Sequence, residues 1–224
     1  MESIKNKELG EDDIHLEILG EWKDSLFLEM FGLPESLLGL LSQTVRLANE
    51  QELIHKDPNA DRKMVESLMR RTKLLEHSIL SWKLSSYEAA LRYLSAPQNR
   101  NAVQAFHQGV ILFYYRRVQN INAIILQDTV RKLLDYVQVS DSSDNAAAVV
   151  LWPCFIAACE ALQPELREAI GHRLSRNASA TRKKSFEVAL TIARRVWELR
   201  DEKQDFTIGW FDVNTLDRSP IIVV

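Results

Sequence analysis

The longest run of apolar positions covers residues 151–161, Leu-Trp-Pro-Cys-Phe-Ile-Ala-Ala-Cys-Glu-Ala, which are hydrophobic almost all the way round a helix. The alanines and valines just before it form helix readily, and Asp144 or Asn145 can cap the first free backbone donors. Pro153 removes a backbone N–H from the helix interior, at a cost of about 3 kcal/mol or more. The pattern predicts a buried, proline-kinked helix over residues 146–162.

Amphipathic patterns separated by short breaks fill the first half of the chain. From Pro34 the apolar residues keep to one face until Asp57, and between Val65 and Trp82 they recur at steps of three and four. This spacing predicts two helices that pack against each other. Residues 102–118 are apolar on several faces and contain a glycine, so we expect a helix surrounded by others, with one neighbour approaching closely.

The second half of the chain predicts three more helices and a loop. Residues 126–137 are amphipathic, and Pro164 suits the first turn of a helix that carries Glu165 beside it. Residues 175–181 are polar and small, which predicts a loop, and Thr181 can cap the last long helix. The buried side of that helix is marked by apolar residues at helical spacing: Phe186, Leu190, Ala193 and Trp197.

Composition agrees with a helical, globular chain. The 224 residues include only seven glycines and six prolines, which favours long helices with short connections. We therefore predict an all-α fold, an irregular multi-helix array of antiparallel helix pairs around the kinked helix at 146–162. We expect a flexible acidic lead-in over residues 1–20 and a single helical domain over residues 21–224.

Charge and chemistry exclude several classes of function. A net charge of −3 argues against binding a phosphate backbone, which needs a concentrated basic face. The two cysteines, Cys154 and Cys159, point about 140° apart on a helix, so we expect neither a disulfide nor a shared metal, but small buried side chains in a reducing compartment. No phosphate-binding glycine loop, nucleophile elbow or histidine ligand motif occurs. We expect no catalytic residue, no metal site and no cofactor in this chain.

Membrane insertion and secretion are likewise not expected. No segment reaches the roughly 18 apolar residues of a membrane span, and the acidic first residues differ from a secretory signal. An intracellular protein is the expectation.

Two short motifs carry a family resemblance. Residues 152–161, with the pattern Trp-Pro-x-Phe-Ile-Ala-x-Cys-Glu-Ala, and the later Arg167, Trp197 and Trp210 resemble the C-terminal end of the fungal-specific transcription factor domain. Residues 30–38, Met-Phe-Gly-Leu-Pro-Glu-Ser-Leu-Leu, are similar to the same family's Gly-x-Pro-x-x-Leu-Leu segment. In many fungal regulators this all-helical regulatory region follows a zinc binuclear cluster.

The resemblance implies a function in transcription. The family's DNA-binding unit needs six cysteines for two zinc ions, whereas these residues include two, so we expect the zinc cluster to be absent from this chain. Residues 21–224 would then be a regulatory, effector-sensing domain that controls transcription through ligand or partner binding in the nucleus, with shuttling to the cytoplasm left open. The alternative is a stand-alone helical interaction module. An enzyme is not expected.

The resemblance also implies a binding site for a small hydrophobic effector in some members. Aromatic side chains offer large apolar area, and a tyrosine adds a hydrogen bond. The alternative is that these side chains belong to the core. Further expected partners are proteins of the transcription machinery, and a homodimer is left open. The candidate lining residues are Phe106, Phe113, Tyr114, Trp152 and Phe155.

Glu160 is an acid on a helix predicted to be buried. A buried charge must be paired, and Arg116, Arg117 or Arg167 can supply the cation. We assign a structural ion pair to Glu160 and Arg167.

Overall fold

The computed structural model describes residues 32–57, 60–84, 97–139 and 144–217, and all regular elements within these ranges are helical. The predicted lead-in over residues 1–20 lies outside them. The all-α prediction is confirmed. The elements are α2 (Glu35–Lys56), α3 (Arg62–Ser81), α5 (Pro97–Arg117), the 3₁₀ helix η2 (Ala123–Leu126), α6 (Gln127–Val139), α7 (Asp144–Glu160), α8 (Pro164–Thr181), α9 (Lys184–Lys203) and α10 (Trp210–Asp217).

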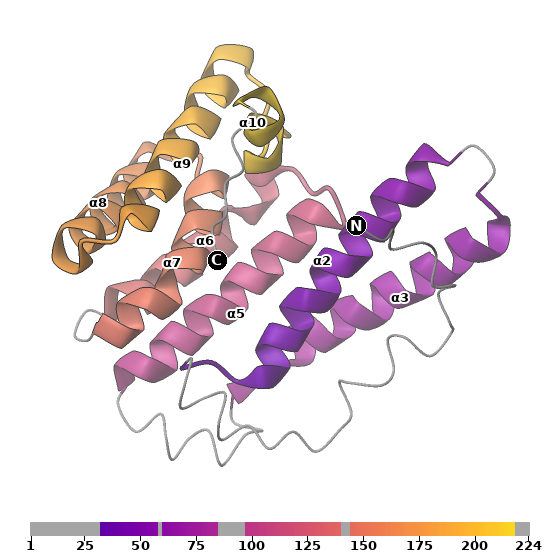
Figure 1. Ribbon diagram of the computed structural model, residues 1–224, viewed down its shortest axis with the longest axis horizontal. Coiled ribbons are helices and arrows are strands. Elements are labelled where there is room, and N and C mark those ends of the chain that lie inside the picture. The colour runs from indigo at the N-terminus through magenta and orange to yellow at the C-terminus, as the bar shows by residue number, and fades with distance from the viewer. Residues whose placement is uncertain (1–31, 58–59, 85–96, 140–143, 218–224) are drawn as a thin grey trace, which may run out of the picture.

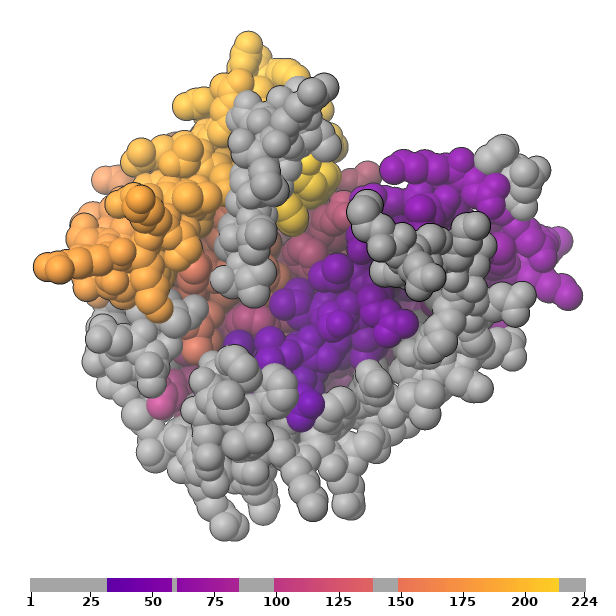
Figure 2. Space-filling view, viewed as in Figure 1, coloured from indigo at the N-terminus to yellow at the C-terminus, as the bar shows by residue number. Residues whose placement is uncertain are grey.

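Helices α5 and α7 form the centre of this arrangement. Among the described helices they make the most extensive contact with each other, and α6 packs against both. The α2–α3 pair lies against α5 at one end, and the α8–α9 pair lies against α7 at the other (Figure 1). The same separation is visible in Figure 2, where α2 and α3 lie apart from α8 and α9. The central position of α7 explains why its sequence is apolar on every side.

The apolar helix predicted over residues 146–162 is α7, and its burial is confirmed. Residues 153–160 are all buried, and the helix continues through Pro153 without interruption. The bend at Pro153 stays a prediction. Among the described helices, none combines the length and apolar character needed to cross a membrane.

Several helix boundaries follow directly from the sequence. Pro34 stands at the N-cap of α2, and Asp57 ends that helix, as the pattern predicts. The Asp61 carboxylate caps α3 by accepting a hydrogen bond from the Lys63 N–H at 3.4 Å. Pro164 occupies the first turn of α8, where its missing N–H has no partner to lose.

The loop predicted over residues 175–181 is wrong. Helix α8 continues through these residues to Thr181 and buries Asn177 and Ala178 on its inner face. Thr181 does not cap α9 either, because its hydroxyl donates to the Asn177 carbonyl at 2.7 Å and the N-cap of α9 is Lys183. Burial against α9 therefore outweighs the weak helix preference of this polar segment.

Buried apolar side chains form two clusters. One is built from α5 to α10, and the other from α2, α3 and the face of α5 turned toward them. Trp152 of α7 is half-buried and packs against both clusters. Helix α5 contributes to each cluster, so it and Trp152 connect the two ends of the core.

Candidate functional site

The five aromatic residues predicted to line an effector site form one group of three and lie at two separate positions. The Trp152 ring contacts Phe106 at 4.9 Å and Phe113 at 5.8 Å between ring centroids, so these three side chains meet at the junction of the two clusters. Phe155 packs instead against Trp210, at 5.9 Å. Effector binding by any of these rings stays a prediction, because their contacts are with one another and with the core.

Tyr114 faces the other end of the core. Its hydroxyl donates to the Thr72 carbonyl of α3 at 3.0 Å and accepts from the Gln119 amide at 2.9 Å. Burial raises the pKa of Tyr114 to about 12. The hydroxyl thus joins α3 to the end of α5.

His107, about two turns earlier on the same face of α5, makes a similar link that the sequence did not predict. One ring nitrogen lies 2.7 Å from the Ile79 carbonyl of α3, and the ring packs 4.9 Å from Trp82. Burial lowers the pKa of His107, although the hydrogen bond to Ile79 opposes this effect. The contact is part of the α3–α5 interface.

Gly109 permits the close approach of α5 and α7. A Cβ at this position would lie 3.0 Å from the Pro153 Cβ and 3.0 Å from Cζ3 of Trp152. Contacts this short are tighter than those of most Cβ atoms, so a side chain at position 109 would force the neighbouring part of α7 to shift. The close neighbour predicted from the sequence is therefore Pro153.

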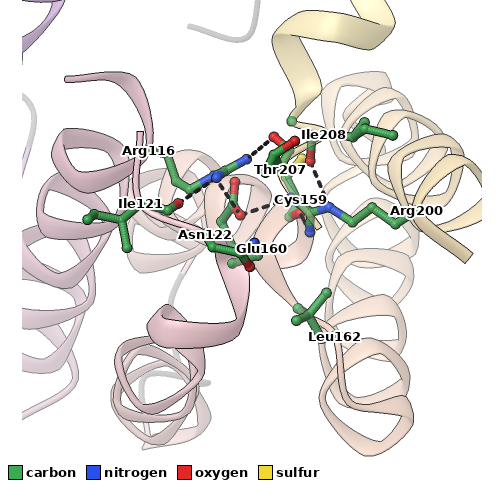
Figure 3. A network of polar contacts seen from close by, with 12 residues as sticks. Arg116, Ile121, Asn122, Cys159, Glu160, Leu162, Arg200, Thr207 and Ile208 are labelled. Atoms are coloured by element: carbon green, nitrogen blue, oxygen red, sulfur yellow. Dashed lines mark hydrogen bonds and ion pairs between the residues drawn. The ribbon is translucent and has the colours of Figure 1, made fainter. Parts of the chain in front are cut away.

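A buried network of charges lies at the C-terminal end of α7. The Glu160 carboxylate is 1% exposed, and its Oε2 lies 3.0 Å from Nε of Arg116 and 3.0 Å from Nη2 of Arg200 (Figure 3). The two guanidinium groups come from α5 and α9, so the carboxylate links three helices. Burial on this scale is tolerated because each ion has partners of opposite charge.

The same guanidinium groups also hold the segment that follows α9. Arg116 donates to the Thr207 carbonyl at 2.7 Å, and Arg200 donates to the Ile208 carbonyl at 2.7 Å (Figure 3). Arg200 further donates to the Cys159 carbonyl at 2.6 Å, and Arg116 to the Ile121 carbonyl at 2.6 Å. Three helices and two connecting segments are thus joined at one point.

The predicted pairing of Glu160 with Arg167 is wrong. Arg167 lies on α8 and makes a two-pronged contact with Asp201 of α9, at 2.6 and 2.9 Å. Its guanidinium also lies 5.5 Å from the Trp197 ring. The side chain therefore joins α8 to α9 near the surface, while Glu160 faces Arg116 and Arg200 in the interior.

Arg200 could have been found from the sequence. It stands three residues after Trp197 and continues the stripe of Phe186, Leu190 and Ala193 that marks the buried face of α9. A cation on an otherwise apolar stripe requires a buried anion. Glu160, an acid predicted to be buried, was a candidate for that anion.

The two cysteines are fully buried, in line with their expected place as small core residues. Burial raises the pKa of Cys154 to about 12, although the nearby charge of Arg173 opposes this effect. Burial, and to a lesser extent Glu160, raises the pKa of Cys159 well above its ordinary value. Within the described ranges, no cluster of three histidine, cysteine, aspartate or glutamate side chains has the geometry to hold a metal ion.

A pocket of about 460 Å³ opens between α6 and α8, away from the predicted aromatic site. Its α6 wall is mostly apolar, and its α8 wall carries both acids and bases. Helices α6 and α8 touch over only a short length, which leaves room between them. The residues that line the pocket are Leu134, Val137, Gln138, Glu165, Glu168, Ala169, His172, Arg173 and Arg176.

Comparison with known proteins gives a family match along almost the whole chain. A family described as the fungal specific transcription factor domain matches residues 3–223. The chain is 24% identical over 196 residues to arginine metabolism regulation protein II of Saccharomyces cerevisiae (strain ATCC 204508 / S288c), an alignment that covers 82% of this chain and 22% of that protein. The chain therefore spans about a fifth of the length of this relative. No solved structure matches.

Proposed function

Because this chain belongs to the fungal-specific transcription factor domain family, we propose that it is the regulatory body of a fungal transcription factor and acts in the nucleus. In this proposal the helical body controls transcription by binding a ligand or a protein partner, and another module contacts DNA. The observation that carries the proposal is the family match, which extends from residue 3 to residue 223. The family's description is that of a transcription factor domain and not of an enzyme class.

The use of charged residues supports a regulatory body rather than a DNA-reading one. The chain has a net charge of −3, whereas proteins that grip DNA concentrate lysine and arginine on one face. Arg116 and Arg200 are turned into the core toward Glu160, and Arg71 of α3 pairs with Glu50 of α2. These cations hold helices together and are not presented to a phosphate backbone.

The experiment that tests this proposal attaches the chain to a heterologous zinc cluster that binds a known operator. Reporter transcription is then compared with that produced by the zinc cluster alone, at equal protein abundance. We expect the attached chain to raise or lower the reporter signal. We also expect the purified chain alone to give no operator shift in a gel assay.

Two outcomes would contradict the proposal. One is equal reporter output with and without the attached chain over a range of nutrient conditions. The other is sequence-specific DNA binding by the isolated chain, which would place the DNA reader within these 224 residues.

A stand-alone interaction module is the second candidate function. Two adjacent isoleucines of η2 favour it, because Ile124 is 56% exposed and Ile125 is 72% exposed. Exposed apolar side chains side by side are typical of protein contact sites. This candidate predicts that Ile125→Ser abolishes capture of a partner while the attached chain leaves the reporter unchanged.

A further inference from the structure

Helix α3 carries apolar side chains on its solvent-facing side as well as on its buried side. Leu75 and Ile79 are buried in the cluster that α3 forms with α2 and α5. Four of the nine large apolar side chains that are exposed among the described residues also belong to α3. Three of them, Met69, Leu74 and Leu80, are 61%, 50% and 51% exposed. Packing within the chain therefore does not account for these three side chains.

The charge of α3 is opposite in sign to that of the whole chain. The helix contains five lysines and arginines against two glutamates, whereas the chain carries a net charge of −3. Both glutamates are already engaged, one by Arg62 of the same helix and the other by Tyr115 of α5. Arg70 and Lys73 are exposed, and within the described part of the chain neither side chain has an ion-pair or hydrogen-bond partner. These two cations are therefore available to a partner.

The exposed apolar and basic side chains lie together on one side of α3. Their positions repeat at intervals of three and four residues, which places them on one face of a helix. This face extends for about 16 Å along the helix axis. Figure 1 shows α3 at the edge of the molecule, beside α2. We call this surface the α3 stripe, and its residues are Met69, Arg70, Lys73, Leu74, His77 and Leu80.

We propose that the α3 stripe binds an acidic amphipathic segment of a partner protein. Carboxylates of this segment pair with Arg70 and Lys73, whose charges have no other partner among the described residues. Its apolar side chains pack on Met69, Leu74 and Leu80 and remove their exposed surface from water. The proposal names one kind of partner for the proposed regulatory role, and its biological meaning rests on that role.

The combination of charge and apolar surface favours a protein partner over DNA or a membrane. Tight binding to DNA relies on many cations that neutralise phosphates, whereas the α3 stripe offers two cations without partners. A helix that lies on a membrane buries a broad apolar face in the lipid, but the broad apolar face of α3 is turned into the core. An acidic segment with interspersed apolar residues complements both kinds of side chain in the stripe.

Fluorescence anisotropy of three labelled peptides with the purified 224-residue chain tests the proposal. The first peptide is a helix of about 16 residues in which glutamates and leucines recur at intervals of three and four positions. The second peptide has glutamine in place of every glutamate, and the third has serine in place of every leucine. We expect saturable binding of the first peptide at low salt, about fivefold tighter than that of either other peptide, because exposed ion pairs and small apolar contacts each contribute modestly.

Substitutions in the α3 stripe separate the two kinds of contact. The double variant Arg70→Gln/Lys73→Gln is expected to weaken the first peptide about fivefold and to leave the glutamine peptide unchanged. The double variant Leu74→Ser/Leu80→Ser is expected to weaken the first peptide about fivefold and to leave the serine peptide unchanged. All four positions are exposed, so circular dichroism should show that both variants remain folded.

The matched control is the double variant Arg194→Gln/Val188→Ser. It removes one base and one apolar side chain from exposed positions of α9, away from the α3 stripe. Binding of all three peptides to this variant should equal binding to the native chain.

The proposal is overturned if the first peptide gives no saturable binding, if the glutamine peptide binds as tightly, or if the control variant weakens binding as much as the stripe variants do. Tighter binding of a DNA duplex or of phosphatidylserine vesicles, lost in Arg70→Gln/Lys73→Gln, would overturn it in favour of a phosphate ligand. Self-association of the native chain that both stripe variants abolish would overturn it in favour of a second copy. Regulation is measured separately by reporter output, so the proposed function and the α3 stripe can fail independently.

Discussion

Glu160 illustrates how one buried acid can fix the position of several helices. Its carboxylate lies between two guanidinium groups that are at most 2% exposed. Removing one partner of a buried ion pair leaves an uncompensated charge in a medium of low dielectric, which typically costs about 3 to 5 kcal/mol. Here two cations depend on one anion.

Glu160→Gln is therefore expected to lower the free energy of unfolding by about 3 kcal/mol or more, measured by urea denaturation. The matched control is Asp201→Asn, which removes the partner of Arg167 from a carboxylate that is 57% exposed. An exposed pair contributes less than about 1 kcal/mol, so the control should change stability little. Equal losses in the two variants would show that Glu160 is not in the interior.

The burial of the two thiols predicts how they react with a thiol reagent. Neither Cys154 nor Cys159 should react with a thiol reagent at pH 8 in the folded protein, and both should react in guanidinium chloride, because thiolates are the reactive form and burial raises both pKa values. The unfolded thiol titrates near 9.0, whereas the pKa of Cys154 in the fold is about 12. The protonated thiol is favoured in the folded state, so the raised pKa of Cys154 contributes to the free energy of unfolding. That contribution is complete below pH 9 and is lost as the pH rises toward 12.

Rapid labelling of either cysteine without unfolding would contradict this expectation. A melting temperature that does not fall between pH 9 and pH 12 would do the same.

At single positions, the sequence predicted whether a residue is buried more readily than it predicted the residue's ion-pair partner. The burial of Glu160 followed from the apolar residues around it, but three arginines were candidates and the wrong one was chosen. Arg167 is seven residues from Glu160 in the sequence, whereas the observed partners Arg116 and Arg200 are 44 and 40 residues from it. Only the crossing of α5, α7 and α9 brings them together, and helix patterns do not specify crossings.

The contact between α5 and α7 depends on the absence of a side chain at one position. Gly109 lies against Pro153, so a helix interior that would normally favour alanine carries glycine instead. Gly39 of α2 offers the opposite case, because a Cβ added there would have no neighbour within 4 Å.

Gly109→Ala and Gly39→Ala are expected to change stability in opposite directions. Gly109→Ala should lower the free energy of unfolding by about 1 to 3 kcal/mol, since the added methyl forces α5 away from Pro153. Gly39→Ala should raise it by up to about 1 kcal/mol, because alanine favours helix and meets no obstacle. Thermal and urea denaturation of the two variants measure both effects. A gain for Gly109→Ala would mean that α5 and α7 are farther apart than described.

Helix existence was easier to predict than helix length. The patterns from Pro34 to Trp82 and over residues 102–118 identify α2, α3 and α5, because their apolar periodicity is long and regular. The loop predicted over residues 175–181 was wrong because serine, asparagine and threonine have a low intrinsic preference for helix. In the fold α9 packs on α8, and this burial extends α8 to Thr181.

Trp152 connects the two apolar clusters, so it affects whether they unfold together. Its ring packs against both apolar clusters, one of which includes α2 and α3 and the other α8 and α9. Helix α5 belongs to both clusters as well. Shared residues of this kind couple the two ends, so a change at one end alters the stability of the other.

Trp152→Ala is expected to lower the free energy of unfolding by about 3 kcal/mol, as for truncation of a large core side chain. Unfolding followed by circular dichroism and by tryptophan fluorescence should give one coincident transition for the native chain. In the variant the two apolar clusters should unfold less cooperatively, so that the circular dichroism and fluorescence transitions no longer coincide. A near-neutral change at Trp152 would mean that its side chain does not join the clusters.

The proposed regulatory role requires the whole helical body to be folded while another module reads DNA. The decisive measurement is the ratio of reporter output with the attached chain to output with the heterologous zinc cluster alone. We predict a ratio different from one for the native chain and for Gly39→Ala, and a ratio near one at matched abundance for any variant, such as Glu160→Gln, that circular dichroism shows to be unfolded. A ratio of one for the native chain, or an unchanged ratio for a demonstrably unfolded variant, would contradict a regulatory role for this fold.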